Sequence, residues 1–387
     1  KEGRDFFRNA VHEAFDRLEA RYNPIVIEGA GSVSELNLHD QDIVNMPMAM
    51  YAKADVLLVA DIDKGGVFAS AYGSIMLMTE EERKRVKGLL INKFRGDIRL
   101  FESGINILEK LCGVPVVGVI PYFNDIVIEE EDSVSLHTKN LQATAGKVNV
   151  AVILLPHISN FTDFDRLELD ERVNLYYTNN TEEIAKADII ILPGSKSTID
   201  DLYELRRNGV AQAVLRATRA GATVLGICGG YQMMGREVTD PLHQEGEQEC
   251  MPGLGLLPVT TRLTGEKTTR QTKFHFLEKK EECIGYEIHQ GISDRIKDTD
   301  SRSFARLEDG TDDGCWMNHH CMGTYIHGVL DNQTFIDYLL EPFAEKTRTR
   351  SAFDYTAFKE EQYDKLAALI RSHVNMPLIY KIMKQDD

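Results

Sequence analysis

The segment TVLGICGGYQMMG (residues 223–235) holds the side chain best suited to nucleophilic chemistry. A strand is predicted to lead into Cys228, and a helix is predicted to begin near Tyr231. Gly226 and Gly230 stand two residues on either side of Cys228, and a sharp strand-to-helix turn around a nucleophile needs small residues there. The start of the helix favours the thiolate, which is the form that attacks. An ordinary cytosolic cysteine is a small buried hydrophobe, but the glycine frame favours a nucleophile.

A thiolate nucleophile needs a proton partner and donors for the oxyanion that its attack creates. His327 follows an apolar run in GTYIHGVLDN, where parallel-sheet topology could bring it beside Cys228. A histidine at a strand end is also commonly a structural residue. Gly194 lies in LPGSKST, directly after the run at 189–192. Its backbone N–H and that of Gly229 could form an oxyanion hole.

Four polar residues of the first half follow strand-like runs, where open parallel sheets bind ligands. Glu28 opens EGAGS, Asp61 and Asp63 lie in ADIDKGGVF, and Asn92 lies in INKFRGD. Three carboxylates at adjacent strand ends can hold Mg²⁺, and an amide can read the edge of a nucleotide base. Solvated loop acids and a turn asparagine are the alternative interpretation.

Short β-branched apolar runs alternate with helical stretches along the chain. They are residues 25–27, 56–59, 89–91 and 116–120, then 148–155, 189–192, 223–227 and 322–326. Runs that are apolar at successive positions are buried on both faces, which is typical of parallel strands covered by helices. The sequence therefore predicts an α/β protein with two doubly wound, mostly parallel sheets.

An acidic and then polar segment at 128–147 is predicted to be a linker between two domains. We assign residues 1–145 to the first α/β domain, 146–335 to the second, and 336–387 to a C-terminal helical tail. The spacing of apolar residues predicts a helix at 357–374 within this tail.

Two further segments have a recognisable pattern. Residues 6–22 carry the stripe of an amphipathic helix, which we expect to pack on a sheet. Residues 235–282 are rich in Thr, Gly and charge, and predict antiparallel ribbons or loops inserted in the second domain.

The composition excludes several classes of function. With 387 residues, 43% of them hydrophobic and 27% charged, the chain resembles an average globular protein. The net charge of −17 repels nucleic acid and anionic membranes. No apolar run is long enough for a membrane span or a signal peptide, and six cysteines without a CxxC pair indicate reduced thiols. We expect a cytoplasmic protein, and the sequence does not indicate its oligomeric state.

The order PGS, then GICGGYQ, then a strand-ending histidine resembles the class I glutamine amidotransferases. In these domains a cysteine attacks the side-chain amide of glutamine and releases ammonia, so the resemblance implies that Cys228 is the nucleophile and His327 its base. Most such domains carry an acid two residues after the histidine, but Val329 stands there in this chain. The orienting role could pass to another group, such as Glu287, or to none.

Other motifs resemble those of one subgroup of these amidotransferases. The segment GYEIH ahead of the histidine resembles the subgroup attached to cobyrinate-amidating enzymes, in which His289 is either a substrate contact or a packed sheet residue. In the first half, VIEGAGS, LNLHDQDIVNM, ADIDKGGVF and INKFRGD resemble the ATP-binding half of the cobyric acid synthase family, a group of dethiobiotin-synthetase-like ATPases. This resemblance implies that Glu28 binds Mg²⁺, that Asp61 and Asp63 lie near metal or a corrinoid carboxylate, and that Asn92 lies near adenine.

The function implied by this resemblance is amide formation. ATP would activate carboxylates b, d, e and g of adenosylcobyrinic acid a,c-diamide, and glutamine would supply ammonia. A cobyrinic acid a,c-diamide synthase, a stand-alone cysteine hydrolase and a non-catalytic binding module are the alternatives.

The family begins with a GxxxxGK[ST] phosphate-binding loop that this sequence lacks, and residue 1 is Lys. We therefore expect roughly the first hundred residues of the family to be missing. We also expect weak MgATP binding with slow glutaminase activity.

Overall fold

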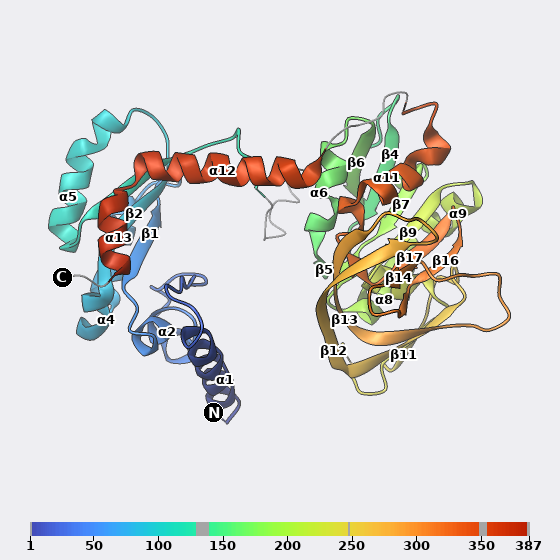
Figure 1. Cartoon of the computed structure of the whole chain (residues 1–387), viewed down its shortest axis with the longest axis horizontal. Coiled ribbons are helices and arrows are strands. Elements are labelled where there is room, and N and C mark those ends of the chain that lie inside the picture. The colour runs from blue at the N-terminus through green and yellow to red at the C-terminus, as the bar shows by residue number, and fades with distance from the viewer. Residues whose placement is uncertain (1, 129–138, 247, 348–353, 385–387) are drawn as a thin grey trace. The chain divides into compact units, whose positions relative to one another are not determined.

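The computed structural model describes residues 2–128, 139–246, 248–347 and 354–384 (Figure 1). It divides the chain into two compact units. Unit 1 comprises Lys1–Ile128 and Lys359–Asp387, and unit 2 comprises Glu129–Phe358. Half of the expected linker at 128–147, residues 129–138, lies outside the described residues.

Unit 1 contains a parallel sheet with strand order β1-β2-β3. Its strands are β1 (Val56–Asp61), β2 (Val86–Phe94) and β3 (Val116–Pro121), and its helices before residue 128 are α1 (Glu2–Glu19), α2 (Met46–Tyr51), α3 (Val67–Leu77), α4 (Glu80–Arg85) and α5 (Glu102–Cys112). Leu89, Ile91, Ile75 and Leu108 are fully buried and form the centre of its core. The three strands expected at 56–59, 89–91 and 116–120 are confirmed.

The segment 25–27, which we expected to be a strand, does not form one. Val26 is 86% exposed and Ile27 is 39% exposed. β-Branched residues favour a strand only where a partner strand and burial stabilise them, and the described sheet of unit 1 provides neither at this segment. Glu28 therefore begins a loop. The side chain of Asn45 stabilises this loop, since its amide accepts the N–H of Ala30 and donates to the carbonyl oxygen of Ala30.

Helix α1 forms where the sequence predicts a helix, but its apolar stripe is not buried. Phe6 and Phe7 are 69% and 60% exposed. The described contacts of α1 involve Tyr51 of α2, whose ring stacks on His12 with centroids 3.5 Å apart and whose hydroxyl donates to Asp16. The expectation that this helix packs on a sheet is therefore wrong for the described residues, because its described partner is α2.

Unit 2 contains a six-stranded sheet with strand order β16-β17-β9-β7-β4-β6, parallel except for the β16–β17 pair. The strands are β4 (Val148–Ile153), β6 (Val173–Thr178), β7 (Ile189–Leu192), β9 (Thr223–Ile227), β16 (Cys315–Asn318) and β17 (Cys321–Thr324). The helices are α6 (Asp165–Leu169), α7 (Thr181–Ile184), α8 (Thr198–Arg207), α9 (Val210–Arg219), α10 (Gly229–Met234) and α11 (Gln333–Leu340). Every residue of β4, β7 and β9 is buried, as their continuous apolar runs predict.

A second, mostly antiparallel sheet of unit 2 is built on two long strands, β12 (Val259–Phe276) and β13 (Cys283–Arg295). Strand β12 lies within the segment 235–282, where the sequence predicts antiparallel ribbons or loops, and β13 begins directly after that segment. The shorter strands of this sheet are β10 (Glu237–Thr239), β11 (Cys250–Pro252), β14 (Ala305–Leu307), β15 (Asp312–Asp313) and β18 (Ile326–His327), while β5 (Ile158–Ser159) and β8 (Gly194–Ser195) form a separate pair. Strand β18 pairs with β13 and carries His327 into the site described below.

The chain ends in α12 (Tyr355–His373) and α13 (Met376–Met383). The first of these confirms the helix predicted at 357–374. Between them, Val374 forms an antiparallel bridge with Gly118 of β3. Among the described residues, no helix combines the length and the apolar character that crossing a membrane requires.

Candidate active site

Cys228 lies on a sharp turn between β9 and α10. Its φ of 52° and ψ of −111° fall outside the regions that non-glycine residues ordinarily occupy. A Cβ on Gly226 would lie 2.7 Å from main-chain atoms of the first turn of α10, and a Cβ on Gly230 would lie 1.9 Å from a carbonyl oxygen of β7. The turn therefore requires glycine at both positions, as predicted, although α10 begins at Gly229 and not near Tyr231.

Hydrogen bonds link the thiol of Cys228 to the imidazole of His327, and this imidazole to the carboxylate of Asp163. The imidazole is hydrogen-bonded to the side chain of Cys228, and its Nδ1 lies 2.7 Å from Oδ2 of Asp163. The other carboxylate oxygen accepts the backbone N–H of Gly328 at 2.9 Å. The side chains of His327 and Asp163 are 1% and 2% exposed. Thiol, imidazole and carboxylate thus have the order that an activated nucleophile needs.

The electrostatic environment of His327 favours its protonated form. Burial by itself lowers the pKa of this imidazole, but the charge and hydrogen bond of Asp163, and then the contact with Cys228, outweigh burial and raise the pKa to about 10. The imidazole therefore holds a proton at neutral pH and can deliver it to a leaving group.

Asp163, from the 3₁₀ helix Phe161–Phe164, is the carboxylate that contacts the imidazole. Our suggestion that Glu287 takes this role is wrong. Glu287 instead forms an ion pair with Arg270, and its Oε1 lies 3.6 Å from Nε2 of His289. His289 itself is stacked on Tyr325, with ring centroids 3.9 Å apart.

Gly194 and Gly229 lie close to this chain of groups. A Cβ on Gly229 would lie 2.9 Å from the backbone nitrogen of Ser195, and a Cβ on Gly194 would lie 3.2 Å from Cε1 of His327. Strand β8, which carries Gly194 and Ser195, therefore packs directly against the turn that holds Cys228. The sequence predicts both glycines as oxyanion donors, and the fold brings them together.

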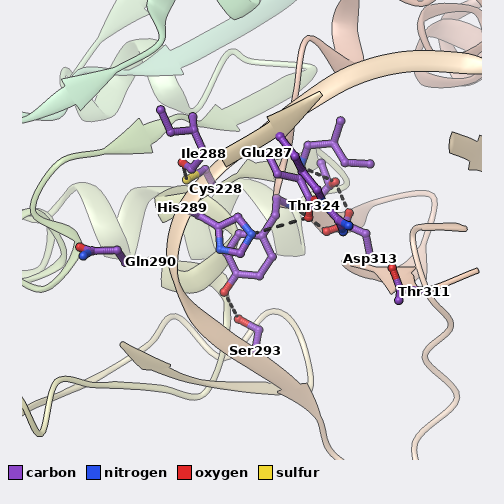
Figure 2. Close-up of polar contacts among 12 residues, drawn as sticks. Cys228, Glu287, Ile288, His289, Gln290, Ser293, Thr311, Asp313 and Thr324 are labelled. Atoms are coloured by element: carbon purple, nitrogen blue, oxygen red, sulfur yellow. Dashed lines mark hydrogen bonds and ion pairs between the residues drawn. The ribbon is translucent and has the colours of Figure 1, made fainter. Parts of the chain in front are cut away.

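Strand β13 borders the thiol (Figure 2). The Sγ of Cys228 donates to the main-chain oxygen of Ile288 at 3.6 Å. The ring of Tyr286 stacks on His327 with centroids 5.2 Å apart and an angle of 18°, and its hydroxyl accepts from the side-chain amide of Asn160 at 3.2 Å. The motif GYEIH therefore lies beside both the thiol and the imidazole.

Both halves of the chain match models of known protein families. A model of the CobB/CobQ-like glutamine amidotransferase domain matches residues 149–335, and an AAA domain model matches residues 6–130. A cobyric acid synthase of Phocaeicola vulgatus is 66% identical over 387 residues, which is 100% of this chain and 78% of that protein. One of Bacteroides fragilis is 67% identical with the same coverage, and one of Listeria monocytogenes is 43% identical over 97% of this chain and 75% of that protein.

The chain belongs to the cobyric acid synthase family. It is therefore a glutamine amidotransferase ligase of cobalamin biosynthesis, with an AAA-type ATP-binding half. The predicted family resemblance and the predicted α/β fold are confirmed.

In the ATP-binding half of this cobyric acid synthase family member, the predicted polar residues lie at the carboxyl ends of β1 and β2. Asp61 pairs in register with Asn92, and its carboxylate lies 2.9 Å from Nζ of Lys93. Asp63 forms an ion pair with Arg95 at 2.5 Å. The fold therefore brings Asp61 and Asn92 together at the sheet edge, and both aspartates have a cationic partner.

The three carboxylates expected to hold Mg²⁺ do not form one cluster. Across the residues that the structure describes, no group of three or more His, Cys, Asp or Glu side chains is arranged to hold a metal ion. Glu28 lies in a loop because residues 25–27 form no strand beside β1. Asp61 and Asp63 are neutralised by Lys93 and Arg95. The described residues thus do not fit a magnesium site made of these three side chains.

Proposed function

We propose that Cys228, His327 and Asp163 hydrolyse glutamine, and that the ammonia amidates carboxylates b, d, e and g of adenosylcobyrinic acid a,c-diamide to give adenosylcobyric acid. The observation that carries the proposal is the buried chain of thiol, imidazole and carboxylate at a glycine-framed turn.

In the first half-reaction the Cys228 thiolate attacks the side-chain amide carbon of glutamine, and the carbonyl becomes a tetrahedral oxyanion. The backbone N–H groups of Gly194 and Gly229 stabilise that oxyanion. His327 gives its proton to the amide nitrogen, the C–N bond breaks, and ammonia leaves from a thioester. Asp163 keeps the imidazole oriented and compensates its positive charge.

In the second half-reaction water attacks the thioester carbon. His327, now neutral, accepts a proton from this water, the C–S bond breaks, and glutamate leaves. The thiolate and the protonated imidazole are thereby restored.

Amide formation also requires an activated carboxylate, because a bare carboxylate repels a nucleophile and offers no leaving group. We propose that ATP supplies the activation in the half of the chain matched by the AAA domain model. Asn92 near adenine, Asp61 and Asp63 near metal or a corrinoid carboxylate, and Glu28 as a Mg²⁺ ligand remain predictions.

Two alternatives give different results. A stand-alone glutaminase would turn over glutamine at the same rate with or without ATP and the corrinoid, whereas the proposed ligase couples the reactions. A cobyrinic acid a,c-diamide synthase would amidate carboxylates a and c. The name shared by the relatives reported above favours cobyric acid as the product.

Alkylation by 6-diazo-5-oxo-L-norleucine, a glutamine analogue, tests the glutaminase half. We expect one adduct per chain, located at Cys228 by peptide mass spectrometry, and none in Cys228→Ala. Cys250→Ala is the matched control because Cys250 is the exposed thiol of the chain, and it should react like the wild type. An adduct at Cys250, or no adduct together with no glutamate release, would contradict the proposal.

A further inference from the structure

Asp201 of α8 is a buried carboxylate in the amidotransferase unit that the proposed chemistry does not use. Its side chain is fully buried. Its carboxylate contacts Nδ1 of His157 at 2.8 Å, accepts the backbone N–H of the same residue at 3.3 Å, and accepts the hydroxyl of Ser195 at 2.7 Å. Burying a carboxylate costs free energy unless hydrogen-bond donors compensate its charge. The contacts with His157 and Ser195 provide this compensation for Asp201.

The partners of Asp201 lie at or next to both strands of the β5–β8 pair. His157 directly precedes β5, and Ser195 is the second residue of β8. The pair matches only two residues on each strand, so its own ladder holds β8 weakly. Ser195 also accepts the backbone N–H of Ser197 at 2.9 Å. The Ser195 hydroxyl therefore accepts one hydrogen bond and donates another, and Asp201 is the acceptor of the hydrogen bond that it donates.

Strand β8 is the wall of the site that faces the reacting carbonyl in the proposed mechanism. Gly194 approaches His327, and the backbone nitrogen of Ser195 approaches Gly229. A donor to an oxyanion must be held within about 0.5 Å of its working position. A displacement of β8 by that amount would weaken the oxyanion hole while leaving the Cys228 turn, which belongs to β9 and α10, in place.

We propose that Asp201 is a positioning residue that fixes β8, and with it the oxyanion hole, through Ser195 and His157. This inference rests on the proposed glutaminase function. Asp201 touches neither glutamine nor the reacting atoms and acts through the strand that it holds.

The proposal predicts that changing Asp201 in the full chain slows glutamine hydrolysis but does not slow alkylation of Cys228. In Asp201→Asn we expect the kcat of glutamine hydrolysis to fall roughly tenfold or more, short of the ~10²- to 10³-fold loss typical of deleting an oxyanion donor, with KM nearly unchanged. The rate at which iodoacetamide alkylates Cys228 should stay at the wild-type value, because displacement at a saturated carbon forms no oxyanion.

The matched control is Glu204→Gln, which changes another carboxylate of the same helix, one that forms an ion pair with Arg207, and it should leave both rates unchanged. Ser195→Ala removes a single contact of Asp201 and should show the same separation with a smaller loss of kcat. It is also the informative variant if Asp201→Asn does not fold.

Two outcomes would overturn the proposal. One is an unchanged kcat in folded Asp201→Asn and in Ser195→Ala. The other is a parallel loss of hydrolysis and alkylation, which would show that Asp201 supports the Cys228 turn and not the oxyanion hole alone. Failure of the proposed function itself looks different, since the wild-type chain would then release no glutamate.

Discussion

Asp163 Oδ2 lies 2.7 Å from Nδ1 of His327, and the two residues are 164 positions apart in the chain. The carboxylate is thus supplied by the 3₁₀ helix Phe161–Phe164, which follows β5, and the residue two positions after the histidine, Val329, is buried and apolar. The same carboxylate accepts the N–H of Gly328, so it fixes both the ring and the main chain that follows it. Asp163 therefore replaces the acid that the sequence lacks at position 329.

Asp163→Asn should abolish most glutaminase activity without unfolding the chain. The amide carries no charge and can present a donor to Nδ1, so the imidazole loses its orientation and the main interaction that raises the pKa of His327. We expect kcat to fall on the order of 10³- to 10⁴-fold, as for the corresponding change in a Ser-His-Asp triad. Glutamate release measured from pH 6 to pH 10 checks this.

The sign of the pH effect follows from the direction of the pKa shift. The wild-type His327 pKa is raised to about 10, so the imidazolium persists through neutral pH and is lost only as the pH approaches that value. In Asp163→Asn the alkaline limb of residual activity should move to lower pH. Glu278→Gln, at a carboxylate that is 92% exposed, is the control and should keep the wild-type profile. An unshifted limb in Asp163→Asn would contradict this role of Asp163.

The sequence predicts those parts of the site that depend on local patterns. The strand that leads to Cys228 is a continuous apolar run, and the turn after it is recognisable because only glycine fits at Gly226 and Gly230. His327 and Gly194 were predictable for a similar reason, since each follows a short apolar run that ends at the same edge of the sheet.

Features that depend on distant partners were not predictable in this way. Asp163 could have been suggested because it follows the run at 148–155, whose strand β4 lies next to β7 in the sheet, but many acids follow strands and no spacing links it to His327. The segment 25–27 and the stripe of α1 have the right local pattern for burial. Their exposure depends on which partner surfaces the fold provides, and a local pattern does not contain that information.

The glycine frame of Cys228 gives a prediction about stability. Gly230→Ala would place a Cβ 1.9 Å from a main-chain oxygen of Leu192, and a backbone atom cannot move aside as a flexible side chain can. We expect a loss of about 3 kcal/mol or more in the free energy of unfolding. Chemical denaturation followed by circular dichroism measures it.

Gly265→Ala is the matched control for this substitution. Gly265 lies in β12 of the same unit, and a Cβ there would meet its nearest atom at 3.9 Å. We expect a change within about 0.5 kcal/mol. Equal effects of the two substitutions would show that the turn at Cys228 is not closed as described.

Asp313, at the end of β15, is a second buried carboxylate near the site, and its contacts lead back to the nucleophile (Figure 2). It accepts hydrogen bonds from the hydroxyl of Thr324 and, at 3.2 Å, from the N–H of Tyr325. The carbonyl of Thr324 in turn accepts the N–H of Cys228 at 2.8 Å. Burial, the largest influence, raises the pKa of Asp313 to about 6 in spite of these bonds.

A raised carboxyl pKa makes the folded state less stable as the pH increases. Asp313 binds its proton more tightly in the folded chain than in the unfolded chain, whose pKa is near 3.8, so its contribution to stability is complete below pH 4 and is lost as the pH rises to about 6. A shift of about two units corresponds to roughly 3 kcal/mol.

Asp313→Asn carries no such proton. We therefore expect the free energy of unfolding of the wild type, relative to this variant, to fall by roughly that amount between pH 4 and pH 7, because all other titrating groups cancel in the difference. Urea denaturation at each pH measures it. A difference that stays constant, or that grows in favour of the wild type, would mean that Asp313 is ionised at no cost and that its hydrogen bonds outweigh its burial.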